Sequence, residues 1–136
     1  MHPMLNIAVR SARAAGKVIL RAFEQVDKIE IESKGTNDLV TNVDISAELA
    51  IVETIQKSYP NHTIIGEECG LIEGKDSDYQ WIIDPLDGTS NFVKGIPHFA
   101  VSIALKVKGK LDQSVIYDPI RGELFTASRG KGAQLN

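Results

Sequence analysis

The densest chemical signal in the sequence is a pair of carboxylates, Asp84 and Asp87, that follows an apolar run at residues 81–83. Mg²⁺ prefers oxygen ligands, and two carboxylates at a strand end, separated by a rigid proline, offer such ligands at fixed positions. Gly88 and Thr89 come next, and a glycine lets the backbone approach closely enough for consecutive amides to hold a phosphate. The spacing therefore predicts a metal site beside a phosphate cradle.

A turn is the competing interpretation of this short segment, because Asp-Pro-x-Asp-Gly sequences also join two strands. A second pair of acids favours the metal site. Glu67 and Glu68 follow another apolar run, at residues 63–65, so two strand ends would deliver carboxylates to one rim. Clustered carboxylates repel one another and lower stability unless a cation is present. We therefore predict that Glu67 binds metal, whereas Glu68 supports the site from outside or is exposed.

Other polar residues have two interpretations each. Asp44 lies in the first turn of a predicted helix, where an acid interacts well with the helix dipole, and it is equally suited to orienting a water. Lys34 and Asp38 lie in a polar segment, for which a solvated surface is the default and a lid or third metal site the alternative. Cys69 follows two acids, which disfavour a nucleophilic thiolate. His2, His62 and His98 lack the spacing of a ligand cluster, so structural roles are predicted for all three.

Two helices are predicted to precede the strands that carry the acids. At residues 4–26 the apolar side chains recur every third or fourth position, which is typical of an amphipathic helix. Thr41, followed three residues later by Asp44, is a capping-box pattern for a second helix, which Pro60 ends. Between the helices, the Gly, Asn and Asp of residues 34–38 predict a loop.

The rest of the chain is predicted to be a sheet. Turns at residues 108–110 and 118–122 are short enough to join neighbouring strands as a meander. The fold class is thus α+β, with two amino-terminal helices packed on a mainly antiparallel sheet. The expected strands are residues 62–65, 79–83, 100–107, 113–117 and 123–127.

Composition narrows the class of protein. A chain of 136 residues that is 43% hydrophobic forms one domain or one lobe of a larger domain. A net charge of -3 provides no general basic field for binding nucleic acid. The single cysteine fits a reducing compartment, so the cytoplasm is expected. Arg10 and Arg13 interrupt the apolar residues of the first fifteen, which disfavours a signal peptide or a membrane span.

The segment from Trp81 to Asn91, Trp-Ile-Ile-Asp-Pro-Leu-Asp-Gly-Thr-Ser-Asn, resembles the signature of the inositol monophosphatase family, as does the acid pair at residues 67 and 68. The resemblance covers the whole chain, and residues 1–10 and 97–104 look like the bacterial SuhB branch. It implies the layered α/β sandwich of the sugar phosphatases, with residues 1–136 as the front lobe. The family's distal Trp-Asp-x-Ala-Ala-Gly segment does not occur here. The chain is therefore expected to be an amino-terminal fragment of a protein about twice as long.

The resemblance also implies a role for each acid. Glu67, Asp84 and the carbonyl of Leu86 would hold one Mg²⁺, and Asp84 would bridge to a second Mg²⁺ that Asp87 also binds. Asp44 and Thr89 would polarise the attacking water. The catalytic residues implied by the resemblance are therefore Asp44, Thr89 and Glu67. The expected substrate-binding set is Glu67, Leu86, Asp87, Gly88 and Thr89.

The implied activity is Mg²⁺-dependent hydrolysis of a small phosphate monoester, with myo-inositol 1-phosphate the first candidate. Related sugar and nucleotide phosphatases, which cleave fructose 1,6-bisphosphate or phosphoadenosine phosphate, share much of the acid motif. A regulatory alternative also follows from the resemblance, because the SuhB branch is associated with transcription antitermination complexes and with the transcription factor NusA. The family usually forms homodimers, and no membrane partner is expected.

Overall fold

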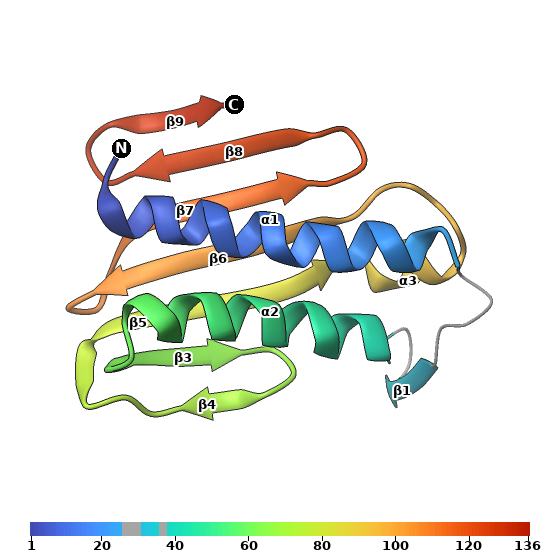
Figure 1. The fold of residues 1–136 in the computed structure, drawn as a ribbon, viewed down its shortest axis with the longest axis horizontal. Coiled ribbons are helices and arrows are strands. Elements are labelled where there is room, and N and C mark those ends of the chain that lie inside the picture. The colour runs from blue at the N-terminus through green and yellow to red at the C-terminus, as the bar shows by residue number, and fades with distance from the viewer. Residues whose placement is uncertain (26–30, 36–37) are drawn as a thin grey trace.

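Two helices cover one face of a seven-stranded sheet in the computed structural model, which describes residues 1–25, 31–35 and 38–136 (Figure 1). The helices are α1 (Pro3–Phe23) and α2 (Asn42–Ser58), which pack against each other and against the central strands. This arrangement confirms the predicted α+β fold. The strands are β3 (His62–Gly66), β4 (Gly70–Ile72), β5 (Asp76–Asp87), β6 (Ala100–Val107), β7 (Lys110–Asp118), β8 (Glu123–Ser128) and β9 (Gly132–Leu135).

The sheet has the order β4-β3-β5-β6-β7-β8-β9. Only β3 and β5 are parallel, and every other neighbouring pair in this sheet is antiparallel. The parallel pair matters for function because the carboxyl ends of parallel strands leave a sheet at the same edge. The predicted meander of β6, β7 and β8 is confirmed.

The capping box predicted for the second helix is present. The side chain of Thr41 accepts hydrogen bonds from the amides of Val43 and Asp44, and Asp44 accepts one from the amide of Thr41. At the first helix, Nδ1 of His2 accepts from the amide of Met4 at 3.1 Å. These caps satisfy amide groups that a helix start leaves without an intrahelical partner.

Several predicted boundaries were wrong. The α1 helix ends at Phe23, and residue 26, the predicted end, lies outside the described residues. Residues 34, 35 and 38, predicted as part of a loop, belong to a small antiparallel pair of strands, β1 (Ile31–Gly35) and β2 (Asp38–Thr41). The strands β4 and β9 and the short helix α3 (Thr89–Val93) were not predicted as elements. Strand pairing supplies hydrogen bonds that local propensity does not anticipate.

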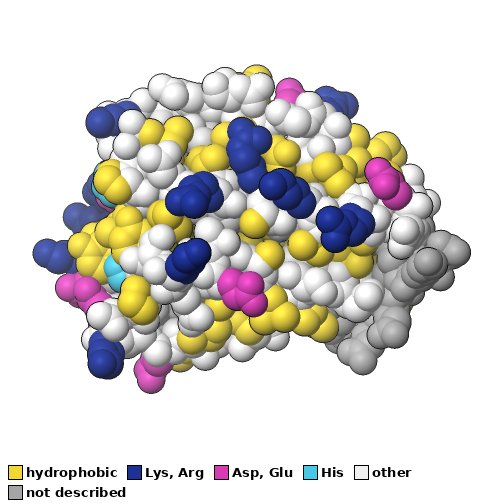
Figure 2. Space-filling model, in the orientation of Figure 1, with side chains coloured by type: hydrophobic (Ala, Val, Ile, Leu, Met, Phe, Trp, Pro, Cys, Tyr) yellow, Lys and Arg dark blue, Asp and Glu magenta, His cyan; other side chains and the backbone are white. Residues whose placement is uncertain are grey.

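One face of α1 is basic. Arg10, Arg13, Lys17 and Arg21 are exposed, and α1 contains no acidic residue. Their spacing of three and four residues places them on one side of the helix, and Figure 2 shows basic side chains gathered over α1. The opposite side is apolar and buried against the sheet. No helix in the described part of the chain is both long and apolar enough to cross a membrane.

Candidate functional site

Two of the predicted acids leave the same end of neighbouring strands. In the parallel pair of β3 and β5, Gly66 lies opposite Ile83, so Glu67 and Asp84 are the next residue on each strand. The amide of Glu67 donates to the carbonyl of Ile83 at 3.1 Å, which joins the two strand ends. Besides burial, the charges of Glu67 and Asp87 both act on the Asp84 carboxyl and raise its pKa. The structure thus brings Glu67, Asp84 and Asp87 together.

Asp84 is the most perturbed of these acids. Its pKa is raised from 3.8 to about 8, first by loss of solvent on burial, then by the hydrogen bond and charge of Glu67 and by the charge of Asp87. The backbone of Leu86 acts in the opposite direction. The atom Oδ1 of Asp84 is buried and has no hydrogen-bond partner within the described residues. A buried carboxylate oxygen without a partner is a chemically suitable ligand for a divalent cation.

The carboxylates are not arranged as a finished metal centre. Across residues 1–25, 31–35 and 38–136, no three His, Cys, Asp or Glu side chains form a group that would hold an ion as they stand. Instead, burial raises the pKa of the Asp84 carboxyl, and the charges of Glu67 and Asp87 raise it further. The donor chemistry fits Mg²⁺, and a cation would replace the proton that Asp84 holds.

The raised pKa of Asp84 predicts a pH-dependent stability for the metal-free protein. Between about pH 4 and about pH 8 the folded state holds a proton that the unfolded state releases, so the free energy of unfolding falls as pH rises. Asp84→Asn removes this proton and should flatten the decline. Because the carboxyl is only half-buried, we expect solvent to limit the effect to about 1 kcal/mol, or about 2–5 °C in Tm.

Thermal unfolding in a chelator, from about pH 5 to about pH 9, measures this effect. Glu53→Gln is the matched control, because Glu53 is an exposed acid on α2. Parallel Tm curves for the wild type and Asp84→Asn would show that Asp84 is ionised throughout this range.

Thr89 and Asp44 form a second pair beside the acids. The hydroxyl Oγ1 of Thr89 lies 2.8 Å from Oδ2 of Asp44 and 3.1 Å from the carbonyl oxygen of Leu86. The shorter contact is to a carboxylate, which is the stronger acceptor. The other oxygen of Asp44 accepts from the amide of Thr41 at 2.9 Å and also from its hydroxyl. Asp44 therefore caps α2 and orients Thr89 at once, so it combines the capping role with the orientation of a site hydroxyl.

Gly88 connects β5 to α3 in a conformation that favours glycine, with φ of 102° and ψ of 33°. A Cβ on Gly88 would lie 3.0 Å from the carbonyl oxygen of His98 and 3.1 Å from Cβ of Phe99. The close approach that the sequence predicted is therefore an approach to the segment before β6. Thr89 begins the short helix α3, and the phosphate cradle remains a prediction.

Glu48 is a site residue that the sequence reasoning missed. It is 2% exposed, and its two carboxylate oxygens accept hydrogen bonds from the amides of Glu68 and Cys69. The signal that was available is its position four residues after Asp44, which places both acids on one side of a helix. The pKa of the Cys69 thiol is raised by burial and by Glu48, which agrees with the predicted absence of a nucleophilic thiolate. The side chains of Lys34 and Asp38 lie outside the described residues.

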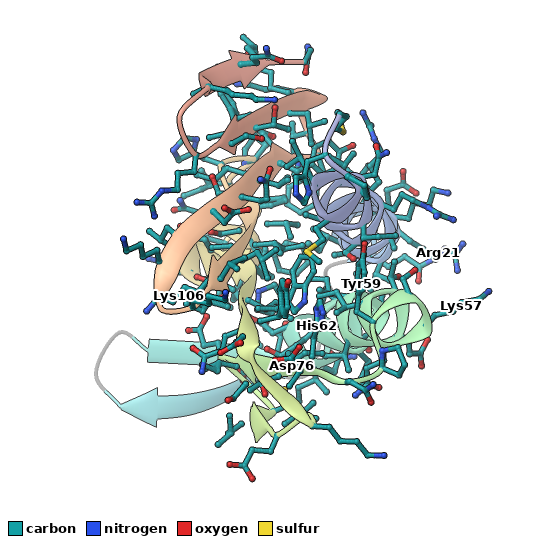
Figure 3. All side chains as sticks on the ribbon, turned by 90° about the vertical axis from the view of Figure 1, so that its left-hand side faces the viewer. Arg21, Lys57, Tyr59, His62, Asp76 and Lys106 are labelled. Carbon is teal, nitrogen blue, oxygen red and sulfur yellow. The ribbon has the colours of Figure 1, made fainter. Side chains whose placement is uncertain are left out.

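His62 belongs to an aromatic stack near the start of β3 (Figure 3). Its ring is nearly parallel to those of Tyr59 and Tyr79, at centroid distances of 4.6 and 4.5 Å. Nδ1 accepts from the indole nitrogen of Trp81 at 3.0 Å. Burial lowers the pKa of His62, and the charge of Asp76 opposes this shift. This supports the structural role predicted for this histidine.

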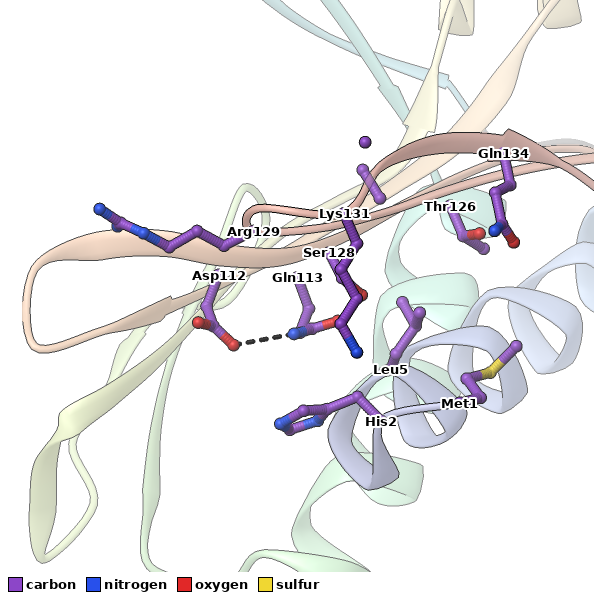
Figure 4. A pocket seen from close by; sticks show the side chains of 12 residues that line it. Met1, His2, Leu5, Asp112, Gln113, Thr126, Ser128, Arg129, Lys131 and Gln134 are labelled. Atoms are coloured by element: carbon purple, nitrogen blue, oxygen red, sulfur yellow. Dashed lines mark hydrogen bonds between the residues drawn. The ribbon is translucent and has the colours of Figure 1, made fainter.

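A cavity of about 690 Å³ lies elsewhere, between the start of α1 and strands β7 to β9 (Figure 4). His2 and Leu5 reach it from the helix, and Gln113 and Ser128 reach it from the strands. The Gln113 amide is partnered on both sides: its nitrogen donates to Asp112 at 2.9 Å, and its oxygen accepts from the Ser128 hydroxyl at 2.6 Å. None of the predicted site residues lines this cavity.

Comparisons with known proteins agree on one family. The sequence model of the inositol monophosphatase family matches residues 1–136. The Nus factor SuhB of Escherichia coli strain K12 is 63% identical over 136 residues, which is 100% of this chain and 51% of that relative. The crystal structure of extragenic suppressor protein suhB from Bartonella henselae matches with a TM-score of 0.96 and 44% identity, over 98% of this chain and 52% of that chain.

A third comparison concerns an IMPase/NADP phosphatase complexed with Mg²⁺ and phosphate. That structure matches with a TM-score of 0.75 and 29% identity, over 88% of this chain and 46% of that one. The chain thus spans about half the length of the relatives that it matches.

Proposed function

The chain belongs to the inositol monophosphatase family, and on that basis we propose that it forms the amino-terminal half of a Mg²⁺-dependent phosphate monoesterase. The observation that carries this proposal is the placement of the Thr89–Asp44 pair, whose hydroxyl and carboxylate are 2.8 Å apart, beside the acids of β3 and β5. A hydroxyl activated by a carboxylate and a cluster of acids that could hold a cation are complementary parts of a hydrolytic site.

Each residue has a proposed task in the complete protein. Glu67, Asp84, Asp87 and the carbonyl of Leu86 would hold Mg²⁺. Bound Mg²⁺ would neutralise charge on the phosphate oxygens and would lower the pKa of the water that attacks phosphorus.

Thr89 and Asp44 would activate the attacking water. The Thr89 hydroxyl proton is directed to Oδ2 of Asp44, which leaves the lone pairs of Oγ1 to accept a hydrogen bond from a water. As that water loses its proton to Oγ1, the hydroxyl proton passes to Asp44. The backbone from Asp87 through Gly88 to Thr89 would bind the substrate phosphate.

We propose myo-inositol 1-phosphate as the substrate, with other sugar or nucleotide phosphates as alternatives. The complete protein is proposed to be a cytoplasmic homodimer. The cytoplasm is supported by the free, exposed Cys69, since a reducing compartment keeps such thiols unpaired.

A regulatory role in transcription antitermination, with NusA as a partner, is the second candidate. The relative in Escherichia coli is called a Nus factor, and the exposed basic face of α1 offers charge for an acidic surface. This face lies on the solvent side of the helix layer, whereas Glu67 follows β3, and Asp84 and Asp87 lie at the carboxyl end of β5. The two functions therefore use different parts of the chain and are compatible.

An Asp87 substitution tests the hydrolytic function and separates it from the regulatory one. In the complete protein, Asp87→Asn should lower phosphate release from myo-inositol 1-phosphate by at least about 10²-fold, because it removes a charge that would hold Mg²⁺. Binding to NusA, measured by calorimetry, should be unchanged. The double substitution Arg13→Gln with Lys17→Gln is the reciprocal control: it should weaken binding to NusA and leave phosphate release unchanged. Full hydrolysis by Asp87→Asn would contradict the proposed site.

A further inference from the structure

Glu48 lies inside the turn that carries one of the proposed metal ligands. The turn joins β3 to β4, whose ends pair at Gly66 and Gly70, so residues 67–69 form its tip. Oε1 of Glu48 accepts from the amide of Glu68 at 3.2 Å, and Oε2 accepts from the amide of Cys69 at 2.6 Å. A carboxylate held by two successive amides is a charge-assisted interaction, stronger than a bond between neutral groups.

The turn is shaped to admit this carboxylate. A Cβ on Gly66 would collide with Oε1 of Glu48 and would lie 2.6 Å from Sγ of Cys69. Any larger residue at position 66 would therefore push the carboxylate away from the two amides. Glu48 itself is 2% exposed, and an ionised side chain at such depth is tolerated only when its hydrogen bonds are made.

These bonds have a consequence for Glu67. Its side chain is exposed, so packing does little to orient it, and its direction depends on the backbone of the turn. That backbone is held on one side by the bond from the Glu67 amide to Ile83, and on the other by Glu48. In that position the charge of Glu67 acts on the Asp84 carboxyl. Without Glu48, the second side of the turn would lose both of these hydrogen bonds.

We propose that Glu48 is a positioning residue that holds Glu67 in place to bind a divalent cation, an inference that rests on the proposed function. Helix α2 then organises the site from one side through two acids one helical turn apart. Asp44 orients the Thr89 hydroxyl, and Glu48 orients the turn that carries Glu67. The helix thereby couples the group that activates water to a group that holds the cation.

Glu48→Gln in the complete protein tests this proposal, because glutamine keeps the size of the side chain but loses the charge and one of the two acceptors. We expect the dissociation constant for Mn²⁺, measured by calorimetry, to rise by about 10- to 100-fold, the usual effect of removing a group that orients a metal ligand. Hydrogen exchange at the amides of Glu68 and Cys69 should also become faster. Glu53→Gln, on the exposed side of the same helix, should change neither measurement.

The two readouts separate the possible failures. Mn²⁺ binding by Glu48→Gln that equals that of Glu53→Gln would overturn the positioning role and leave the proposed function standing. A wild type that binds no Mn²⁺ and hydrolyses no monoester would overturn the proposed function and this inference with it. Weaker binding in Glu48→Gln with unchanged exchange at residues 68 and 69 would also contradict the proposal, because the loss would not act through the turn.

Discussion

Thr89→Ala is expected to lower kcat of the complete protein by about 10²- to 10⁴-fold, the usual range for removing a group that activates water. The substitution removes the hydroxyl that lies 2.8 Å from Oδ2 of Asp44 and leaves every carboxylate of the site unchanged. The affinity for Mg²⁺ should therefore change little. Steady-state hydrolysis of myo-inositol 1-phosphate and calorimetric metal binding, measured on the same preparation, distinguish the two effects.

Thr89→Ser is the matched control, because serine keeps a hydroxyl at the same position and should retain most of the activity. Thr89→Val keeps the shape of threonine without the hydroxyl and should behave as alanine does. Since the Thr89 hydroxyl also links α3 to α2, Tm is measured for each variant. Unchanged turnover in Thr89→Ala would assign this residue to a structural link between the two helices.

The second large effect is expected when residues 1–136 are tested without the rest of the complete protein. Residues 1–136 by themselves should be essentially inactive towards inositol phosphate, even in abundant Mg²⁺. The chain spans about half the length of its relatives, and the resemblance places the acid that completes the second metal site beyond residue 136. Glu67, Asp84, Asp87 and the Leu86 carbonyl would supply oxygen ligands for one octahedral site and leave the second site short of a carboxylate. The clamp on the leaving oxygen is then incomplete.

Self-association should accompany this inactivity. The apolar side chains of Ile116, Phe125 and Leu135 are paired neighbours on β7, β8 and β9 and are between 42% and 53% exposed. Such a row beside an edge strand favours pairing between chains. Phosphate release and sedimentation velocity, measured for residues 1–136 and for the complete protein at equal concentration, test both expectations. Comparable rates would show that this lobe is sufficient for hydrolysis.

Much of the fold could be predicted from local patterns, because the interactions behind those patterns join residues that are close in the sequence. The capping box of Thr41 and Asp44 and the strand at residues 100–107 depend on residues a few positions apart, and both appear as expected. The β4 and β9 strands were missed because their structure depends on pairing with β3 and β8. The β4 strand has only three residues and begins with Gly70, and β9 begins with Gly132 and Ala133, so the partner strand decides their conformation.

By itself the sequence determined which residues are candidates for chemistry, because residue type and spacing mark Glu67, Asp84 and Asp87. Only the tertiary structure decided how they meet: a parallel pairing of β3 and β5 places two strand ends at one edge. It also decided which groups hold them, since Glu48 contacts amides twenty and twenty-one residues away. Contacts of that range arise from packing of α2 on the sheet and leave no periodic trace along the chain. The physical reason is that a hydrogen bond requires proximity in space, which local spacing determines only within a single helix or strand.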